Sequence, residues 1–263
     1  MNWETENNVI SKLYVGGENI IYPWGFETAD SSAFFSLEKG IGYRYEVLEE
    51  KYIFDEKNYH ADLIVKMKEG QWKLTCNDKI INDNAIERKV ELICLEDSYF
   101  MDFVIRFRFK KEFFDYVEIA GQRIFHKNTN VYHQYPTDHI LLKGKKSNVK
   151  LSMLDSTVPS SMAPFMYARD KDNEWVVHVR MLPQKWDKEV IKLCNRWAQT
   201  RPIPQCLSRT LLHSKRLRQN MWYRGERLQF KNIILKRINP NAFPMVKISK
   251  GTTLMWHIKM EMS

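Results

Sequence analysis

The chain has 263 residues, of which 44% are hydrophobic, 13% aromatic and 28% charged. This length and balance are those of a globular protein with a sizeable core, and they exclude disordered and collagen-like classes. No stretch approaches the roughly 18 consecutive apolar residues that a membrane-spanning helix needs, so no membrane partner is expected. The first residues are polar and lack the apolar stretch of a secretory signal, which favours a cytoplasmic protein.

Cysteine spacing and charge distribution narrow the class further. The four cysteines are scattered and form no Cys-x-x-Cys pair, which favours buried free thiols in a reducing compartment over a zinc site. The net charge of +9 is unevenly distributed, because residues 201–240 hold ten Lys and Arg against one acid, Glu226. The rest of the chain is balanced, so attraction to a polyanion is expected mainly from this segment.

Alternation of apolar and polar residues, the pattern of half-buried strands, recurs along most of the chain. Strands are predicted at 9–15, 19–22, 33–37, 42–54, 61–67, 71–76, 86–95, 98–110, 116–120, 122–126, 131–135, 139–143, 149–154, 174–182, 228–238, 245–248 and 253–260. Residues 23–25 are predicted as a turn and residues 158–164 as a loop.

The most regular alternation runs over residues 98–110. One face carries Met101, Phe103, Ile105, Phe107 and Phe109, and the other carries Asp102, Val104, Arg106, Arg108 and Lys110. The aromatic face predicts a strand packed on a core. The charged face is either a solvated surface or the floor of a site, because antiparallel sheets commonly expose one side to water.

Helical periodicity appears only late in the chain. Apolar residues follow Asp187 at the spacing of one helix face as far as Trp197, and residues 214–224 form a second candidate helix. Strands followed by late helices predict an all-β fold. We expect a large antiparallel β-sandwich of two packed sheets, of which a super-sandwich is one form, with one or two helices in the C-terminal third. A single domain over residues 1–263 would carry a helical, basic segment at 187–225.

Arginine, histidine and acidic side chains share the polar faces of two predicted strands. The candidates are Asp102, Arg106 and Arg108 in one strand and His178 and Arg180 in the other. Arginine suits bidentate capture of carboxylate, sulfate or phosphate, so converging faces would form a substrate-binding surface. The alternative is a solvated face with cross-strand ion pairs. Because the chain is neutral outside 201–240, the arginines are expected to have acidic partners, such as Asp102, Glu87 or Glu91.

A second polar cluster spans residues 125–139, which hold three of the seven histidines. Its candidate site residues are Asn128, Asn130, Tyr132, His133 and Tyr135. His133 and Tyr135 share a face if this segment forms a strand, and imidazole and phenol groups suit proton transfer. The asparagines can hold hydroxyls. A strand–turn–strand segment without function is the alternative, and the histidine spacing matches no compact metal motif, so no metal is predicted.

The third cluster is the basic segment, in which the candidate binding residues are Arg216, Arg218 and Trp222. Aromatic rings interleaved with basic side chains suit stacked bases and phosphates. They suit an acidic polysaccharide equally well, since rings also stack on sugar faces. A solvated helix with a local excess of basic residues is the alternative.

The sequence lacks a phosphate-binding glycine loop, a nucleophile elbow and a metalloprotease motif. We therefore expect no cofactor. The preferred hypothesis is binding, and cofactor-independent processing, of an acidic carbohydrate or similar polyanion on an Arg/His/Tyr-lined sheet face. A lyase or epimerase would hold the sugar carboxylate with the strand arginines and move protons with His133, His178 or Tyr135. A hydrolase would need two carboxylic groups, for which Asp102 and Asp138 are the candidates, although the sequence does not place them together.

Other classes of protein fit the same residues. A binding protein without activity would use the same sheet face, and the sequence does not separate it from an enzyme. A nucleic-acid-binding protein would act through residues 201–240. The aromatic content permits a lipocalin-like pocket for an apolar small molecule, but the arginine-lined strand argues against a dry cavity.

Overall fold

The computed structural model describes residues 1–29, 33–38, 42–67, 70–100, 102–129, 132–135, 137–160, 162–183 and 246–263. These residues form antiparallel strands and one short 3₁₀ turn, η1 (Lys111–Phe113), with no α-helix among them. In this described part, no helix is long and apolar enough to cross a membrane. The helices predicted within 187–225 and the strand predicted at 228–238 lie outside the described residues, so the single domain over the whole chain stays a prediction.

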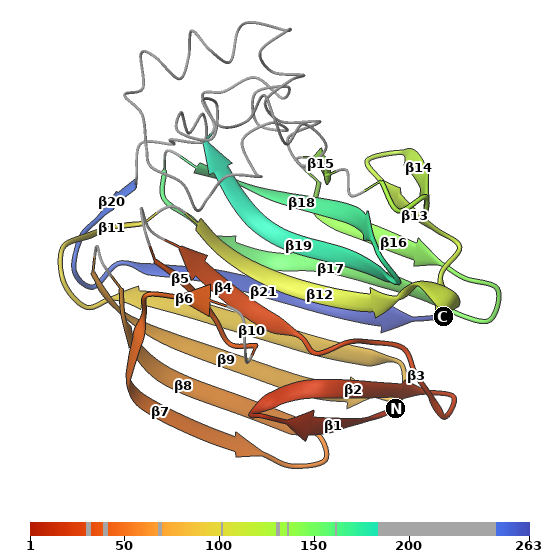
Figure 1. Ribbon diagram of the computed structural model, residues 1–263, viewed down its shortest axis with the longest axis horizontal. Helices are drawn as coiled ribbons and strands as arrows, with labels where there is room; N and C mark the ends of the chain where they lie inside the picture. Colours follow the sequence, from red (N-terminus) through yellow and green to blue (C-terminus); the bar gives the residue numbers. More distant parts are fainter. Residues whose placement is uncertain are drawn as a thin grey trace, which may run out of the picture.

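Two large antiparallel sheets lie one above the other (Figure 1). The nine-stranded sheet has the order β14 (Gln122–Phe125), β13 (Tyr116–Ile119), β16 (His139–Lys143), β17 (Asn148–Thr157), β21 (Thr253–Met262), β10 (Ala85–Cys94), β9 (Gln71–Asn82), β8 (Asn58–Lys66), β7 (Glu46–Phe54). The seven-stranded sheet has the order β15 (Tyr132–Tyr135), β18 (Met162–Lys171), β19 (Glu174–Pro183), β12 (Asp102–Lys110), β4 (Gly25–Ala29), β5 (Phe34–Ser36), β6 (Gly42–Tyr43). Smaller sheets pair β1 (Asn2–Glu6), β2 (Val9–Val15) and β3 (Glu18–Asn19), and β11 (Ser98–Phe100) with β20 (Val246–Ile248).

The hydrophobic core lies between the two large sheets, because each presents one face of alternating apolar side chains to the other. On β12, Phe103, Ile105, Phe107 and Phe109 are all buried in this core, as their alternation predicts. From the nine-stranded sheet, Trp256 stacks on Phe103 with ring centroids 6.2 Å apart, and its Nε1 donates a 3.1 Å hydrogen bond to the Phe103 carbonyl oxygen. The predicted β-sandwich is confirmed.

One ion pair is buried within this core. Arg88 of β10 donates to Asp78 of β9 from Nε at 2.6 Å and from Nη2 at 2.8 Å. The Arg88 guanidinium carbon lies 5.5 Å from the centroid of the Trp24 ring, and Nη1 donates a 3.4 Å hydrogen bond to the Gly25 carbonyl oxygen. A bidentate pair with a further acceptor offsets much of the cost of burying two charges. The pair also connects the nine-stranded sheet to the start of β4.

Two strands of the seven-stranded sheet correct the sequence prediction. β4 begins at Gly25, in a segment predicted as a turn, and β18 begins at Met162, inside a predicted loop. Glycine and proline favour turns locally, and β18 contains Pro164, but pairing with β12 and β19 outweighs this preference. The strand predicted over 98–110 is divided into β11 and β12, which belong to different sheets.

Candidate active site on the seven-stranded sheet

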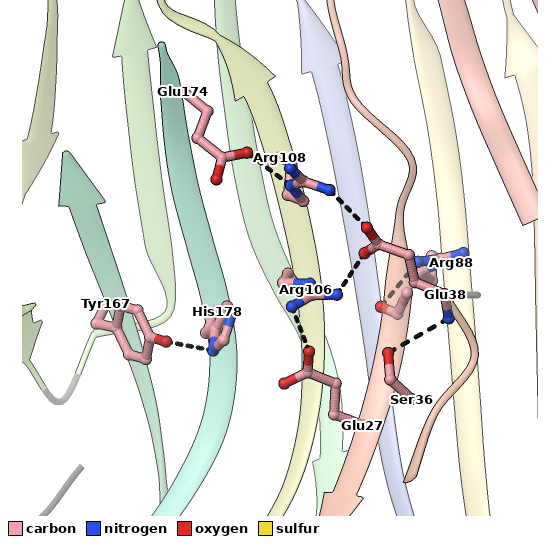
Figure 2. Close-up of polar contacts among 10 residues, drawn as sticks. Glu27, Ser36, Glu38, Arg88, Arg106, Arg108, Tyr167, Glu174 and His178 are labelled. Atoms are coloured by element: carbon pink, nitrogen blue, oxygen red, sulfur yellow. Dashed lines mark hydrogen bonds and ion pairs between the residues drawn. The ribbon is translucent and has the colours of Figure 1, made fainter. Parts of the chain in front are cut away.

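The candidate site lies on the face of the seven-stranded sheet that is turned away from the core, which we call the outer face. On β12, Arg106 alternates with the core residues Ile105 and Phe107, so it lies on this face. His178 of β19 is the direct cross-strand partner of Arg106, and Tyr167 of β18 is the direct partner of His178. Directly paired residues share a face, so the three side chains form one row across the sheet (Figure 2).

Three glutamates and two arginines alternate in a line of ion pairs on the outer face (Figure 2). Arg106 Nη1 lies 2.6 Å from Glu27 Oε1, and Arg106 Nη2 contacts Glu38. Arg108 Nη1 lies 2.5 Å from Glu38 Oε1, and Arg108 Nε lies 2.6 Å from Glu174 Oε2. All three glutamates are buried. Each of these arginines is therefore held by two carboxylates of the chain itself.

The acidic partners of the arginines are not those expected from the sequence. Glu87 and Glu91 belong to β10 in the nine-stranded sheet, where Glu87 Oε2 lies 3.2 Å from His257 Nε2 and Glu91 Oε1 lies 2.8 Å from Lys89 Nζ. The side chain of Asp102 lies outside what the structure describes. The charge balance of the chain outside residues 201–240 correctly indicated that the arginines pair with carboxylates of the chain. Strand pairing decides which carboxylates these are.

Glu27 is a buried carboxyl of the outer face, and its pKa is raised above the ordinary value. Burial raises the pKa of Glu27, the positive charge of Arg106 opposes that rise, and the negative charge of Glu38 adds to it. Glu27 stands on β4, on the opposite side of β12 from His178. A carboxyl with a raised pKa binds and releases a proton closer to neutral pH, as a general base requires.

His178 is buried and neutral. Burial lowers the pKa of its imidazole well below the ordinary 6.5, and the nearby charges of Arg106, Arg169 and Arg180 lower it further. Its Nδ1 hydrogen-bonds the hydroxyl of Tyr167, while its Nε2 is buried without a hydrogen-bond partner among the described residues. An imidazole in this state has one ring nitrogen that no described residue uses.

Arg180 joins the same face because it follows His178 by two residues along β19. Its side chain is buried, and its guanidinium carbon lies 5.9 Å from the centroid of the Tyr167 ring. The structure therefore brings together Arg106, Arg108, His178 and Arg180, four of the residues predicted as site residues.

His133 and Tyr135 do not join this cluster. On β15 they pair with Ala168 and Met166 of β18, which are both buried in the core. The two residues share a face, as the spacing predicts, but that face is the inner one. Neither is placed beside His178, because Tyr167 on the outer face alternates with their partners.

The remaining predicted residues are placed elsewhere or lie outside the described part. Asn128 Oδ1 accepts a 2.7 Å hydrogen bond from the backbone N–H of Asp172, so it joins a loop to the β18–β19 turn. For Asp102 and Tyr132 the structure describes the strand position but not the side chain. Asn130, Arg216, Arg218 and Trp222 lie outside the described residues.

Sequence reasoning did not identify Glu27, Glu38, Glu174 or Tyr167. Glu27 stands between Phe26 and Thr28 just after the predicted turn at 23–25, where the sequence predicted no strand. Glu38 follows β5 and is 68 residues from Arg106 in the sequence, so no local pattern could have joined the two. Among the described residues, no group of three His, Cys, Asp or Glu side chains is arranged to hold a metal.

The chain resembles known proteins in its fold and not in its sequence. No protein-family model matches the chain, and no curated protein matches it in sequence. Among solved structures, a candidate aldose 1-epimerase from Escherichia coli K12 superposes with a TM-score of 0.53 at 7% identity, over 98% of this chain and 93% of that one. A galactose mutarotase-like protein from Lactobacillus casei superposes with a TM-score of 0.52 at 8% identity, over 100% of this chain and 99% of that one. The chain thus has the β-sandwich fold of aldose epimerase-type proteins, and at this identity the likeness concerns the fold alone.

Proposed function

We propose that the protein is a cofactor-independent enzyme that interconverts the anomers of a free aldose on the outer face. The observation that carries this proposal is the presence, on one face of the sheet, of two buried groups suited to proton transfer. Glu27 has a raised pKa, and His178 is a neutral imidazole whose Nε2 has no partner among the described residues. The resemblance in fold to proteins named as aldose epimerases and mutarotases supports the same class of reaction.

The reaction requires one base and one acid. The base takes the proton of the anomeric hydroxyl while the bond between C1 and the ring oxygen breaks, and the acid gives a proton to that ring oxygen. Rotation about the C1–C2 bond exposes the other face of the aldehyde, and ring closure reverses both proton transfers. Glu27 acts as the base and His178 as the acid. General acid–base groups of this kind each contribute about 10²–10⁴-fold to a rate.

Strand order and register together set the separation of these groups. Neighbouring strands lie about 4.8 Å apart, so β4 and β19, which flank β12, are about 10 Å apart. Glu27 pairs with Val104, two residues along β12 from Arg106, which is the partner of His178. Both side chains rise from the same face, with Arg106 between them (Figure 2).

The ion pairs favour a neutral sugar over an acidic one. Arg106 and Arg108 were expected to hold a substrate carboxylate, but both are engaged by Glu27, Glu38 and Glu174. An acidic sugar would have to compete with these buried carboxylates for the same guanidiniums.

The experiment is to measure anomer exchange by proton NMR for a panel of neutral aldoses and their uronic acids. We expect accelerated exchange with at least one neutral aldose, and a loss of about 10²–10⁴-fold in Glu27→Gln and in His178→Asn. Glu87→Gln, which alters a carboxylate of the nine-stranded sheet, serves as the matched control and should retain full activity. Binding of aldoses without any acceleration would leave a carbohydrate-binding protein and overturn the enzymatic proposal.

The cellular setting is part of the same proposal. Cys76 and Cys94 are free and buried, which suits the reducing cytoplasm. Nucleic-acid binding through residues 201–240 stays a prediction, because that segment lies outside the described residues. It would be measured by the salt dependence of oligonucleotide binding.

A further inference from the structure

The hydroxyl of Tyr167 hydrogen-bonds Nδ1 of His178, and this hydrogen bond has two alternative forms. Either the phenol O–H donates to a bare Nδ1, or Nδ1–H donates to the phenol oxygen. The first form places the single imidazole proton on Nε2, and the second leaves Nε2 bare. The choice decides whether the unpartnered nitrogen of His178 is a donor or an acceptor toward a ligand.

Acid strength favours the first form. Phenol is a far stronger acid than the N–H of a neutral imidazole, and an imidazole nitrogen is a stronger base than a phenol oxygen. The O–H···N arrangement therefore pairs the better donor with the better acceptor. Both residues are buried, so water does not offer either of them an easy alternative partner. The imidazolium form, in which both nitrogens would carry protons, is opposed by burial and by the neighbouring arginines.

We propose that Tyr167 is a positioning residue that fixes His178 in the Nε2–H form and resupplies its proton. The contact between the phenol and Nδ1 carries this inference, together with the unpartnered Nε2 on the same ring. The tautomer rests on this contact and on the relative acid strengths of phenol and imidazole, whereas the proton resupply rests on the proposed anomer exchange. The atom that His178 recognises is then a hydrogen-bond acceptor, which matches the ring oxygen of an aldose.

The proton transfers balance during ring opening. Glu27 takes the proton of the anomeric hydroxyl, the C1–O bond of the ring breaks, and the ring oxygen takes the proton of His178 Nε2. His178 Nδ1 then takes the hydroxyl proton of Tyr167, so the imidazole stays neutral and a phenolate forms. That phenolate lies beside the cationic Arg180, whose guanidinium carbon is 5.9 Å from the ring centroid. Ring closure returns each proton along the same path.

The first measurement tests the tautomer without any substrate. Long-range ¹H–¹⁵N spectra of the full chain report which imidazole nitrogen carries the proton, and a His178→Gln spectrum identifies the signals of His178 among the seven histidines. We expect a protonated Nε2 and a bare Nδ1, with a clear shift of Nδ1 in Tyr167→Phe. A protonated Nδ1 in the unmodified protein, or a spectrum unchanged by Tyr167→Phe, overturns the proposal.

The second measurement tests the proton resupply. Tyr167→Phe should lower kcat about 10–100-fold while leaving KM for the active aldose nearly unchanged, since the phenol does not touch the sugar. Tyr59→Phe is the matched control, because it also removes a buried phenol hydroxyl, which donates a 2.7 Å hydrogen bond to the carbonyl oxygen of Asn8. Equal kcat in Tyr167→Phe and Tyr59→Phe overturns the resupply role. Absence of anomer exchange in the unmodified protein overturns the proposed function, while the spectra still decide the tautomer.

Discussion

The outer faces of the two large sheets carry similar residue types in very different surroundings. On the nine-stranded sheet, Lys89 and Glu91 form an ion pair whose side chains keep 46% and 30% of their exposure. On the seven-stranded sheet, Arg106 and Glu38 keep only 13% and 10%. Water screens the first pair and is largely absent from the second, so the same chemistry gives a solvated surface in one place and shifted pKa values in the other.

This difference explains why alternation of charge and apolar residues does not by itself indicate a site. Both outer faces arise from equally regular strands. Among the described residues, distant segments supply the buried partners of Arg106 and Arg108 on the seven-stranded sheet, whereas Lys89 and Glu91 of the nine-stranded sheet pair within one strand and stay partly exposed. We therefore expect substitutions on the two outer faces to change the free energy of unfolding by very different amounts. Removing one carboxylate from each face tests this expectation.

The largest expected effect on stability follows from removing Glu38, which bridges two arginines. We expect Glu38→Ala to lower the free energy of unfolding by about 2–4 kcal/mol, because Arg106 and Arg108 each lose one of two carboxylate partners in a largely buried setting. Urea denaturation measures this loss. A loss no larger than that of a surface pair would mean that the outer face is solvated in solution.

A smaller effect concerns pH and arises from His178. Its pKa is lowered in the folded protein, so below pH 6.5 the unfolded chain binds a proton that the folded chain does not. Stability is therefore full above pH 6.5 and falls as the pH drops toward the folded pKa, by about 1.4 kcal/mol per pH unit. Glu27, whose pKa is raised, contributes with the opposite sign, since its folded form holds its proton to a higher pH.

The contribution of His178 is isolated by comparison with a variant. Unfolding free energies of the unmodified protein and of His178→Gln, measured in urea at pH 7.5 and pH 5.5, should differ more at the higher pH. The contribution of Glu27 is common to both proteins. Parallel pH profiles for the two proteins would contradict a buried, neutral His178.

The smallest effect is expected on the nine-stranded sheet. Glu91→Ala removes the carboxylate 2.8 Å from Lys89 and should lower the free energy of unfolding by less than about 1 kcal/mol, an effect that added salt reduces further. The measurement is the same urea titration at low and high salt. A salt-insensitive loss as large as that of Glu38→Ala would remove the distinction between the two faces.

Much of the fold was predictable because strand alternation is a local property. The aromatic face of residues 98–110 predicted the core positions of Phe103, Ile105, Phe107 and Phe109, and these four residues are buried. Met101, on the same predicted face, lies outside the described residues. The same pattern placed Arg106 and Arg108 together on the other face. β4 and β18 were not predicted, since Gly25 and Pro164 signal turns locally and only pairing with neighbouring strands makes them part of a sheet.

The sequence by itself determined the all-β class, the alternating strands and the charge balance of the chain outside residues 201–240. The tertiary structure decided which faces meet. Alternation fixes how side chains are divided between the two sides of one strand, but strand pairing between distant segments decides which side faces the core. His178 thereby lies beside Arg106, whereas His133 turns inward beside Ala168. The same long-range pairing brings Glu27 to Arg106, 79 residues away in the chain, and Glu38 to Arg108, 70 residues away.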